Sequence, residues 1–475
     1  MALHRKDGAE QPYIPLGIFK LRIPFIHYRY EVAEGIQAIF MCATCLGAIP
    51  VLTQYLGVPY EIAWSMVVIN GCLYFLHALL GDPVVPGWIT PAIPVVLAYL
   101  GNYTIGPERI KALVALQIMV GVIFLIMGIT GIAGKLMRAI PVSIQAGILL
   151  GAAVAAVIGE IQPALLFKGK DMVDAVVVRG AGRAQLFPYC VGFSGLFAYF
   201  LLFSKSFQNM RKKSIFLDMV GKFGMLPAIL LGVVLGPLFK ELPVPNFDLS
   251  YVTNAGKTLW LVMIPDMNSL LDAVSPLRLG WPQWSLYVAA IPTAIAAYII
   301  AFGDFVTTEV LITDADEART DEKIDFNANR SNLISALRNF IMAIVAPYTQ
   351  LCGPLWAAVT VSTAQRYKEG RKGMDSIFSG VGSFRLTTAL TVAIIPIAEF
   401  VRPVLPVALS ITLLVQGYAC ASLGMRMLNN DMDRGIAGVM AAVLATLGAA
   451  WGLGTGIVLY FLLAFTLKKK EAAKA

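Results

Sequence analysis

Long apolar runs separated by short polar loops dominate the chain. We count fourteen such runs, most of them near the ~20 residues that a helix needs to cross a hydrocarbon core. Apolar residues are continuous within each run rather than alternating, which favours helices over strands. The pattern therefore predicts an all-α polytopic membrane protein with fourteen transmembrane segments. The predicted segments cover residues 33–56, 61–80, 86–101, 110–133, 139–158, 186–204, 220–239, 285–313, 332–346, 349–363, 380–401, 405–424, 434–449 and 451–467.

Two regions within this pattern contain prolines and glycines that a continuous helix does not tolerate. Residues 86–94 hold three prolines, and residues 346–354 hold two prolines and a glycine. Pro91 lies 58 residues after the start of the first run, and Pro347 lies 62 residues after the start of the eighth. The breaks thus occupy corresponding places, which predicts two inverted seven-span repeats with broken third and tenth helices, as in many secondary transporters. Ordinary kinks in packed helices are the alternative.

Composition and charge agree with a membrane protein. Apolar residues make up 58% of the chain and charged residues only 14%. The net charge of +8 comes from Lys and Arg in short loops, so we expect no nucleic-acid partner. A cytoplasmic N-terminus places about 25 of the 37 Lys and Arg inside and about 10 outside. We therefore expect both termini in the cytoplasm and a location in a bacterial inner (plasma) membrane.

The predicted organisation has five parts. They are a cytoplasmic interfacial N-terminus (1–32), a first seven-span repeat (33–239), an inter-repeat loop (240–284), a second seven-span repeat (285–467) and a basic cytoplasmic tail (468–475).

Ionisable side chains within the apolar runs are costly and therefore suggest function. We expect Asp304, in the eighth run, to accept a proton coupled to transport; a structural carboxylate is the alternative. Arg338 either pairs with Asp304 or lines an anion site, and structural pairing is favoured. Arg385 is expected to snorkel at a cytoplasmic helix end, and His77 is expected to be a packing residue.

Motifs for other mechanisms are missing from the sequence. The chain has no GxxxxGK[ST] phosphate loop, no HExxH and no GxSxG, so neither a nucleotide-driven pump nor an enzyme is indicated. We expect no metal site and no cofactor. The expected partners are a small-molecule substrate, the lipid bilayer and a coupling ion, H⁺, with Na⁺ possible.

Short motifs along most of the chain carry a resemblance. They are residues 35–41 in the first run, Pro141-Val142 and Pro406-Val407 at the starts of the fifth and twelfth, 299–304 in the eighth, and 347–349 with 364–367 around the tenth. In order and spacing these motifs resemble the nucleobase and ascorbate permease family, the uracil and xanthine permeases, with wider fold relatives among bicarbonate and sulfate transporters. The resemblance implies a core of spans 1–4 and 8–11 that moves against a gate of spans 5–7 and 12–14. It also implies a homodimer formed through the gate.

The positions that bind a nucleobase in that family differ in this chain. The family's eighth-span Glu is replaced by Ile300, its first-span His by Ala38, and its polar tenth-span stretch falls on residues 353–356. A site that loses these partners leaves the polar edges of a base unpaired, whereas half-helix N-termini favour anions. A one-turn shift of the tenth-span alignment is the alternative, since it restores polar contacts.

We therefore expect a proton-coupled secondary active transporter of a small organic solute, an anion such as a carboxylate. The alternatives are a nucleobase (purine or uracil):proton symporter and, from another class, a passive anion channel or binding receptor. The predicted substrate site comprises Gln37, Thr90, Pro91, Ile300, Phe302, Asp304, Tyr348, Thr349, Gln350 and Gly353. Gly353 is expected to face the space between the two half-helices.

Overall fold

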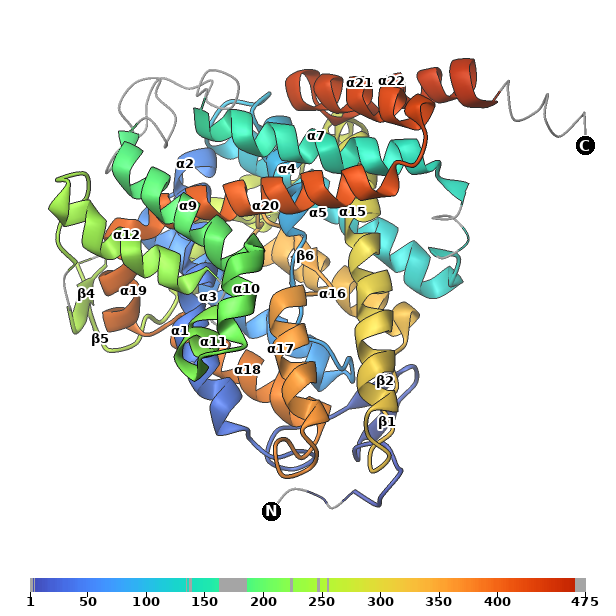
Figure 1. Ribbon diagram of the computed structural model, residues 1–475. Helices are drawn as coiled ribbons and strands as arrows, with labels where there is room; N and C mark the ends of the chain where they lie inside the picture. The colour runs from blue at the N-terminus through green and yellow to red at the C-terminus, as the bar shows by residue number, and fades with distance from the viewer. Residues whose placement is uncertain are drawn as a thin grey trace, which may run out of the picture.

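The protein is a helical molecule with three short two-stranded sheets in the part described (Figure 1). The computed structural model describes residues 3, 5–133, 135, 139–161, 186–222, 225–245, 248–253 and 256–465.

The elements of the first half follow the predicted runs closely. They are β1 (Ile14–Leu16), β2 (Phe19–Leu21), α1 (Val32–Leu46), α2 (Ala48–Leu56), α3 (Tyr60–Leu79), β3 (Gly87–Trp88), the 3₁₀ turn η1 (Thr90–Ala92), α4 (Ile93–Leu100), α5 (Pro107–Thr130), α7 (Val142–Ile161), α9 (Pro188–Phe203), α10 (Lys205–Arg211), α11 (Ile215–Lys222) and α12 (Leu226–Leu238).

The second half begins after a connection that carries its own small elements. The elements are β4 (Ser250–Val252), β5 (Thr258–Trp260), α13 (Met267–Val274), α14 (Pro276–Leu279), α15 (Trp284–Glu317), α16 (Ala328–Val345), β6 (Cys352–Gly353), α17 (Ala357–Lys368), α18 (Ile377–Thr391), α19 (Ile395–Val401), the 3₁₀ turn η3 (Arg402–Val404), α20 (Leu405–Met427), α21 (Asp431–Leu447), α22 (Ala449–Leu459) and the π-helical turn η4 (Tyr460–Phe465).

Two groups of helices emerge from the packing. One group, which we call the core, joins α1, α3, α5, α15, α16, α17 and α18. The other, which we call the gate, joins α7, α9, α12, α20, α21 and α22. Figure 1 shows α7, α20, α21 and α22 side by side in an upper layer, with α15 and α17 running away beneath them. The helix α4, predicted for the core, contacts α7 of the gate as well as α15 and α5. The division into a core and a gate, and the movement of one against the other, stay predictions.

Several helices have the length and composition of membrane spans. Among the described residues, Tyr60–Leu79, Pro107–Thr130 and Trp284–Phe305 are long and apolar enough to cross a bilayer. Two bent helix pairs, Pro188–Phe203 with Lys205–Arg211 and Ile395–Ala408 with Leu413–Met427, raise the number to at most five. The full count of fourteen spans and their inverted symmetry therefore stay predictions.

Large apolar side chains lie on the outer faces of the gate. Leu196 of α9, Val234 of α12 and Trp451 of α22 are each more than 60% exposed. Apolar patches of this extent on a helical exterior are typical of a surface that faces lipid.

The N-terminal segment packs against loops of the second half. Arg5 and Arg319 both pair with Asp321, at 3.0 and 2.6 Å, and Arg366 at the end of α17 pairs with Glu34 of α1 at 2.8 Å. The hydrogen bond from Arg319 lowers the pKa of Asp321 to about 2. The segment expected at the membrane interface is thus held to the core group by ion pairs.

Candidate anion site at the crossing of two broken helices

The two Pro/Gly-rich segments meet each other in the structure. β3 and β6 pair antiparallel, with Gly87 opposite Gly353 and Trp88 opposite Cys352. The amide of Ile89 donates to the carbonyl of Gln350 at 3.2 Å, and the amide of Trp356 donates to the carbonyl of Val85 at 2.6 Å. The breaks expected near Pro91 and Pro347 are therefore confirmed. Backbone groups of the two broken segments form hydrogen bonds with each other, which they could not form with lipid tails.

The backbone around the paired strands leaves no room for a side chain at Gly87 or Gly353. A β-carbon at Gly353 would lie 2.7 Å from the carbonyl carbon of Trp88, and one at Gly87 would lie 2.6 Å from the carbonyl oxygen of Leu355. The expectation that Gly353 faces open space between the half-helices is therefore wrong: backbone already fills that space.

Carboxamide side chains hold the irregular loop between α16 and α17. Asn339 of α16 accepts from the amide of Cys352 at 3.0 Å and donates to its carbonyl at 2.9 Å. Gln117 of α5 accepts from the amide of Tyr348 at 2.8 Å. These bonds replace the intrahelical bonds that the broken segment lacks.

Arg338 ties the strand crossing to the helices behind it. The Nη1 atom donates to the carbonyl of Gly353 at 2.9 Å and contacts the Nε2 atom of His77 at 3.2 Å. The other ring nitrogen of His77 bonds Asp82 at 2.7 Å, and Asp82 also accepts from Ser331 at 2.6 Å. The predicted pairing of Arg338 with Asp304 is therefore wrong, because the guanidinium bonds backbone carbonyls and His77 instead.

Each half-helix begins just after its strand with no side-chain cap. Thr90 opens η1, which leads into α4, and Trp356 precedes α17. No side chain of the described residues bonds the first amides of α4 or α17. Both helix starts carry the partial positive charge of the dipole, which favours an anion. At α4 the amide of Ile93 already bonds the carbonyl of Thr90 and Pro94 has no N–H, so the start of α17 offers the clearer set of amide donors.

The predicted site residues divide by burial. Gln37, Thr90, Phe302 and Asp304 are partly exposed, and Gln37 donates to Ser362 of α17 at 3.5 Å. The other predicted residues with described side chains, Ile300, Tyr348, Thr349, Gln350 and Gly353, are buried. The side chain of Pro91 lies outside the described residues.

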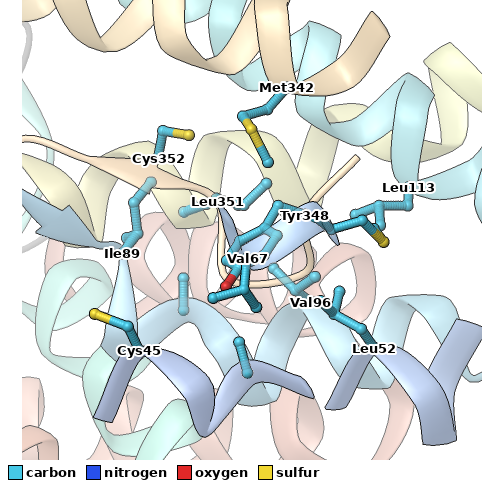
Figure 2. Close-up of a cluster of buried hydrophobic side chains, with 14 of the residues drawn as sticks. Cys45, Leu52, Val67, Ile89, Val96, Leu113, Met342, Tyr348, Leu351 and Cys352 are labelled. Atoms are coloured by element: carbon cyan, nitrogen blue, oxygen red, sulfur yellow. The ribbon is translucent and has the colours of Figure 1, made fainter. Parts of the chain in front are cut away.

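The buried members belong to the packed interior. Figure 2 shows Tyr348 and Leu351 among Val67, Val96 and Leu113, in one cluster of apolar side chains. The reason is that α17 begins at Ala357, eight residues later than the predicted span 349–363, so residues 349–353 form loop and strand. The predicted helical start of this span is therefore wrong.

Asp304 lies where the core meets the gate. It belongs to α15, and it is close enough to Cys420 of α20 for an electrostatic interaction. Within the described part of the chain, its carboxylate has no ion pair and no hydrogen bond. The alternative of a structural carboxylate bonded to a neighbouring helix therefore finds no support among these residues.

No role for Trp356 was predicted from the sequence, and Arg385 was placed wrongly. Trp356, partly exposed, stands immediately before the uncapped start of α17. Arg385, expected to snorkel at a helix end, is fully buried in the middle of α18. No sequence signal marks the packing around Arg385, because its neighbours come from other helices.

Comparison with known proteins gives a family and a fold. Residues 81–367, more than half of the chain, match the model of the Sulfate permease family. The chain is similar to the murine Slc26a9 anion transporter in its inward-facing state, with a TM-score of 0.53 and 12% identity over 92% of this chain and 69% of that one. A second SLC26A9 structure gives a TM-score of 0.52 and 12% identity over 91% of this chain and 65% of that one.

A further solved structure is the transmembrane domain of a cyanobacterium bicarbonate transporter, BicA. It matches with a TM-score of 0.49 and 13% identity over 90% of this chain and 99% of that one. No curated protein sequence matches the chain.

The family match overturns the resemblance to nucleobase and ascorbate permeases and, with it, the uracil–xanthine reading. Three of the six short motifs behind that resemblance, 141–142, 347–349 and 406–407, lie at a broken helix or a helix start, so they reflect a scaffold rather than a substrate. The positions tied to nucleobase binding had already diverged, as Ala38 and Ile300 show. The match over 81–367 spans both broken helices and most of the core group, and the chain belongs to the sulfate permease family.

Proposed function

We propose that this protein is a secondary active transporter of a small anion. Membership of the family makes it a multi-pass membrane transporter and not an enzyme. The observation that carries the proposal is the strand crossing that brings two uncapped half-helix starts into one region. Helix starts at membrane depth attract negative charge and provide amide donors in place of water.

The finer proposal concerns the solute and the driving force. We favour an organic anion such as a carboxylate, because the aromatic and partly exposed Trp356 immediately precedes the amide donors of α17. We assign proton coupling to Asp304, because a carboxylate with no ion pair or hydrogen bond among the described residues, at the boundary between core and gate, can exchange its proton as the two groups move. A homodimer through the gate, an inner-membrane location and cytoplasmic termini complete the proposal.

Uptake into proteoliposomes tests this function. The purified protein is reconstituted and supplied with labelled carboxylates, sulfate, bicarbonate and chloride, with and without an inward proton gradient. We expect saturable uptake of an anion that a proton gradient drives above equilibrium. Non-saturating flux without accumulation would indicate a passive channel, and accumulation driven only by a Na⁺ gradient would reassign the coupling ion.

The variant Asp304→Asn tests the coupling site. We expect pH-driven accumulation to fall to the background level, while uptake down the anion's own gradient continues. Glu309→Gln is the matched control, because Glu309 is exposed on the same helix. Full pH-driven accumulation by Asp304→Asn would contradict the assignment.

A further inference from the structure

A fully buried guanidinium without an oxygen partner lies beside the candidate anion site. Arg385 belongs to α18 and is 0% exposed. Among the described residues, none of its three side-chain nitrogens has an oxygen acceptor, and the only acceptor beside it is the thiol of Cys45. Aromatic faces surround it instead: its Cζ atom lies 4.1 Å from the ring centre of Tyr74, 5.2 Å from that of Trp356 and 5.5 Å from that of Phe384.

The other large buried arginines of the described chain are satisfied differently. Each donates to a carbonyl or carboxylate oxygen within 3.3 Å, and they are Arg5, Arg22, Arg109, Arg330 and Arg338. Arg385 stands apart from this set. Aromatic faces compensate a cation only in part, so an apolar side chain of the same length would be cheaper to bury at this position.

The location of this charge relates it to the half-helix α17. Trp356, whose ring contacts Arg385, is the residue that precedes the first helical residue of α17. Arg338 lies over the same Tyr74 ring, with its Cζ atom 4.7 Å from the ring centre. Two buried positive charges therefore lie close to a helix start that is itself positive.

Negative charge is scarce around this pair. The carboxylate of Asp82 reaches Arg338 only through His77. The thiol of Cys45 lies beside Arg385 and is a weak acceptor. The region thus carries an excess of positive charge in the described structure, and burial of both guanidinium groups strengthens its effect on nearby ions.

We propose that Arg385 is a charge-selecting residue of the anion site: its buried guanidinium sets a positive potential at the start of α17 without touching the solute. This inference rests on the proposed function, because it names what makes that site prefer anions. The role is electrostatic, so it depends on the charge of Arg385 and not on its hydrogen bonds. The electrostatic energy that Arg385 contributes to anion binding also scales with the charge of the ligand, because Coulomb energy is proportional to that charge.

The test compares anions of different charge on the same variants. The variant Arg385→Met keeps an unbranched side chain against the aromatic rings and removes the charge. We expect it to weaken binding of chloride about tenfold and binding of sulfate about a hundredfold, since the lost energy doubles for a divalent ion. Dissociation constants are measured by ligand-induced thermal stabilisation of the detergent-purified protein.

Two further variants separate charge from structure. Arg385→Lys retains the positive charge and is expected to restore most of the affinity for both ions. Arg402→Met is the matched control, because Arg402 also stacks on an aromatic ring, Tyr60 at 4.0 Å, but pairs with Glu399 at 3.2 Å. It should leave both dissociation constants unchanged.

The outcomes distinguish this inference from the proposed function. If the wild-type protein binds neither ion nor any carboxylate, the proposed function fails first. If the wild-type protein binds anions and Arg385→Met binds them equally well, or loses the same factor for both charges, the charge-selecting role is wrong. If Arg385→Met does not fold, Arg385→Gln decides: it also removes the charge, and it must weaken binding of sulfate by a larger factor than binding of chloride.

Discussion

The two arginines that lie over the Tyr74 ring are buried in two different ways. Arg338 of α16 donates hydrogen bonds to the carbonyl of Gly353 and, at 3.5 Å, to the carbonyl of Gly87. It also contacts the ring of His77. Arg385 approaches from α18 and has aromatic faces but no oxygen acceptor among the described residues. Both are fully buried.

This difference separates the framework of the site from its electrostatic character. Arg338 connects the two strands to α16 and α3, so its loss would free groups that the crossing needs. Arg385 bonds no oxygen acceptor among the described residues and has only the weak thiol acceptor of Cys45, so its loss should spare the fold and change the potential. The comparison therefore predicts opposite effects of the same substitution at the two positions.

The largest expected effect on stability comes from Arg338→Met. The substitution leaves the carbonyl of Gly353 and the ring of His77 without their donor in a buried place, at about 1–3 kcal/mol for each group. We expect the detergent-purified variant to melt several degrees below the wild-type protein. Arg385→Met is the comparison and should melt at or above the wild-type temperature. An equal loss of stability in both variants would contradict the distinction between a structural role for Arg338 and an electrostatic role for Arg385.

A somewhat smaller effect is expected from Asn339→Leu. Leucine has nearly the same shape but cannot pair with the amide and carbonyl of Cys352, so two backbone groups lose their partners. We expect about 2 kcal/mol of destabilisation, seen as a lower melting temperature. Asn339→Asp sharpens the test, because it restores the acceptor for the Cys352 amide but not the donor for the carbonyl. It should fall between the wild-type protein and the leucine variant.

The smallest of these effects is expected from Gly353→Ala. Its new methyl group must push the backbone of Trp88 away, at about 1–3 kcal/mol for an overpacked contact. Gly303→Ala in α15 is the matched control, because a β-carbon there has no neighbour within 4 Å. Differential scanning fluorimetry on the two variants gives the comparison. A Gly353→Ala protein as stable as Gly303→Ala would mean that the strands do not pair as closely as described.

The sequence predicted where the helices break but not that the two broken segments pair with each other as strands. Prolines and glycines at residues 86–94 and 346–354 exclude continuous helix by backbone chemistry alone. That the two breaks pair as strands depends on contacts between residues more than 250 positions apart, such as Trp88 and Cys352, which no local pattern encodes. Hydropathy also does not distinguish the extended residues 350–356 from the first turns of a helix, so α17 was placed too early.

Contacts between distant helices also explain why single residues such as Arg385 were not placed correctly from the sequence. Asp304 stood out because a carboxylate in an apolar run is rare. Arg385 was assigned to a helix end because α18 was predicted to begin at residue 380, whereas it begins at Ile377 and keeps the guanidinium inside. The aromatic rings that surround it come from α3, from the start of α17 and from its neighbour Phe384. Only the fold brings them together.

The position of a bound anion tests the central claim most directly. Crystals of the purified protein soaked with selenate, a sulfate analogue with a strong anomalous signal, locate the ion without reference to transport. We predict an anomalous peak at the start of α17, within hydrogen-bonding distance of the amides of residues 357–359 and on the side that faces η1. A peak confined to the outer loops, with none between the two half-helix starts, would contradict the proposed anion site.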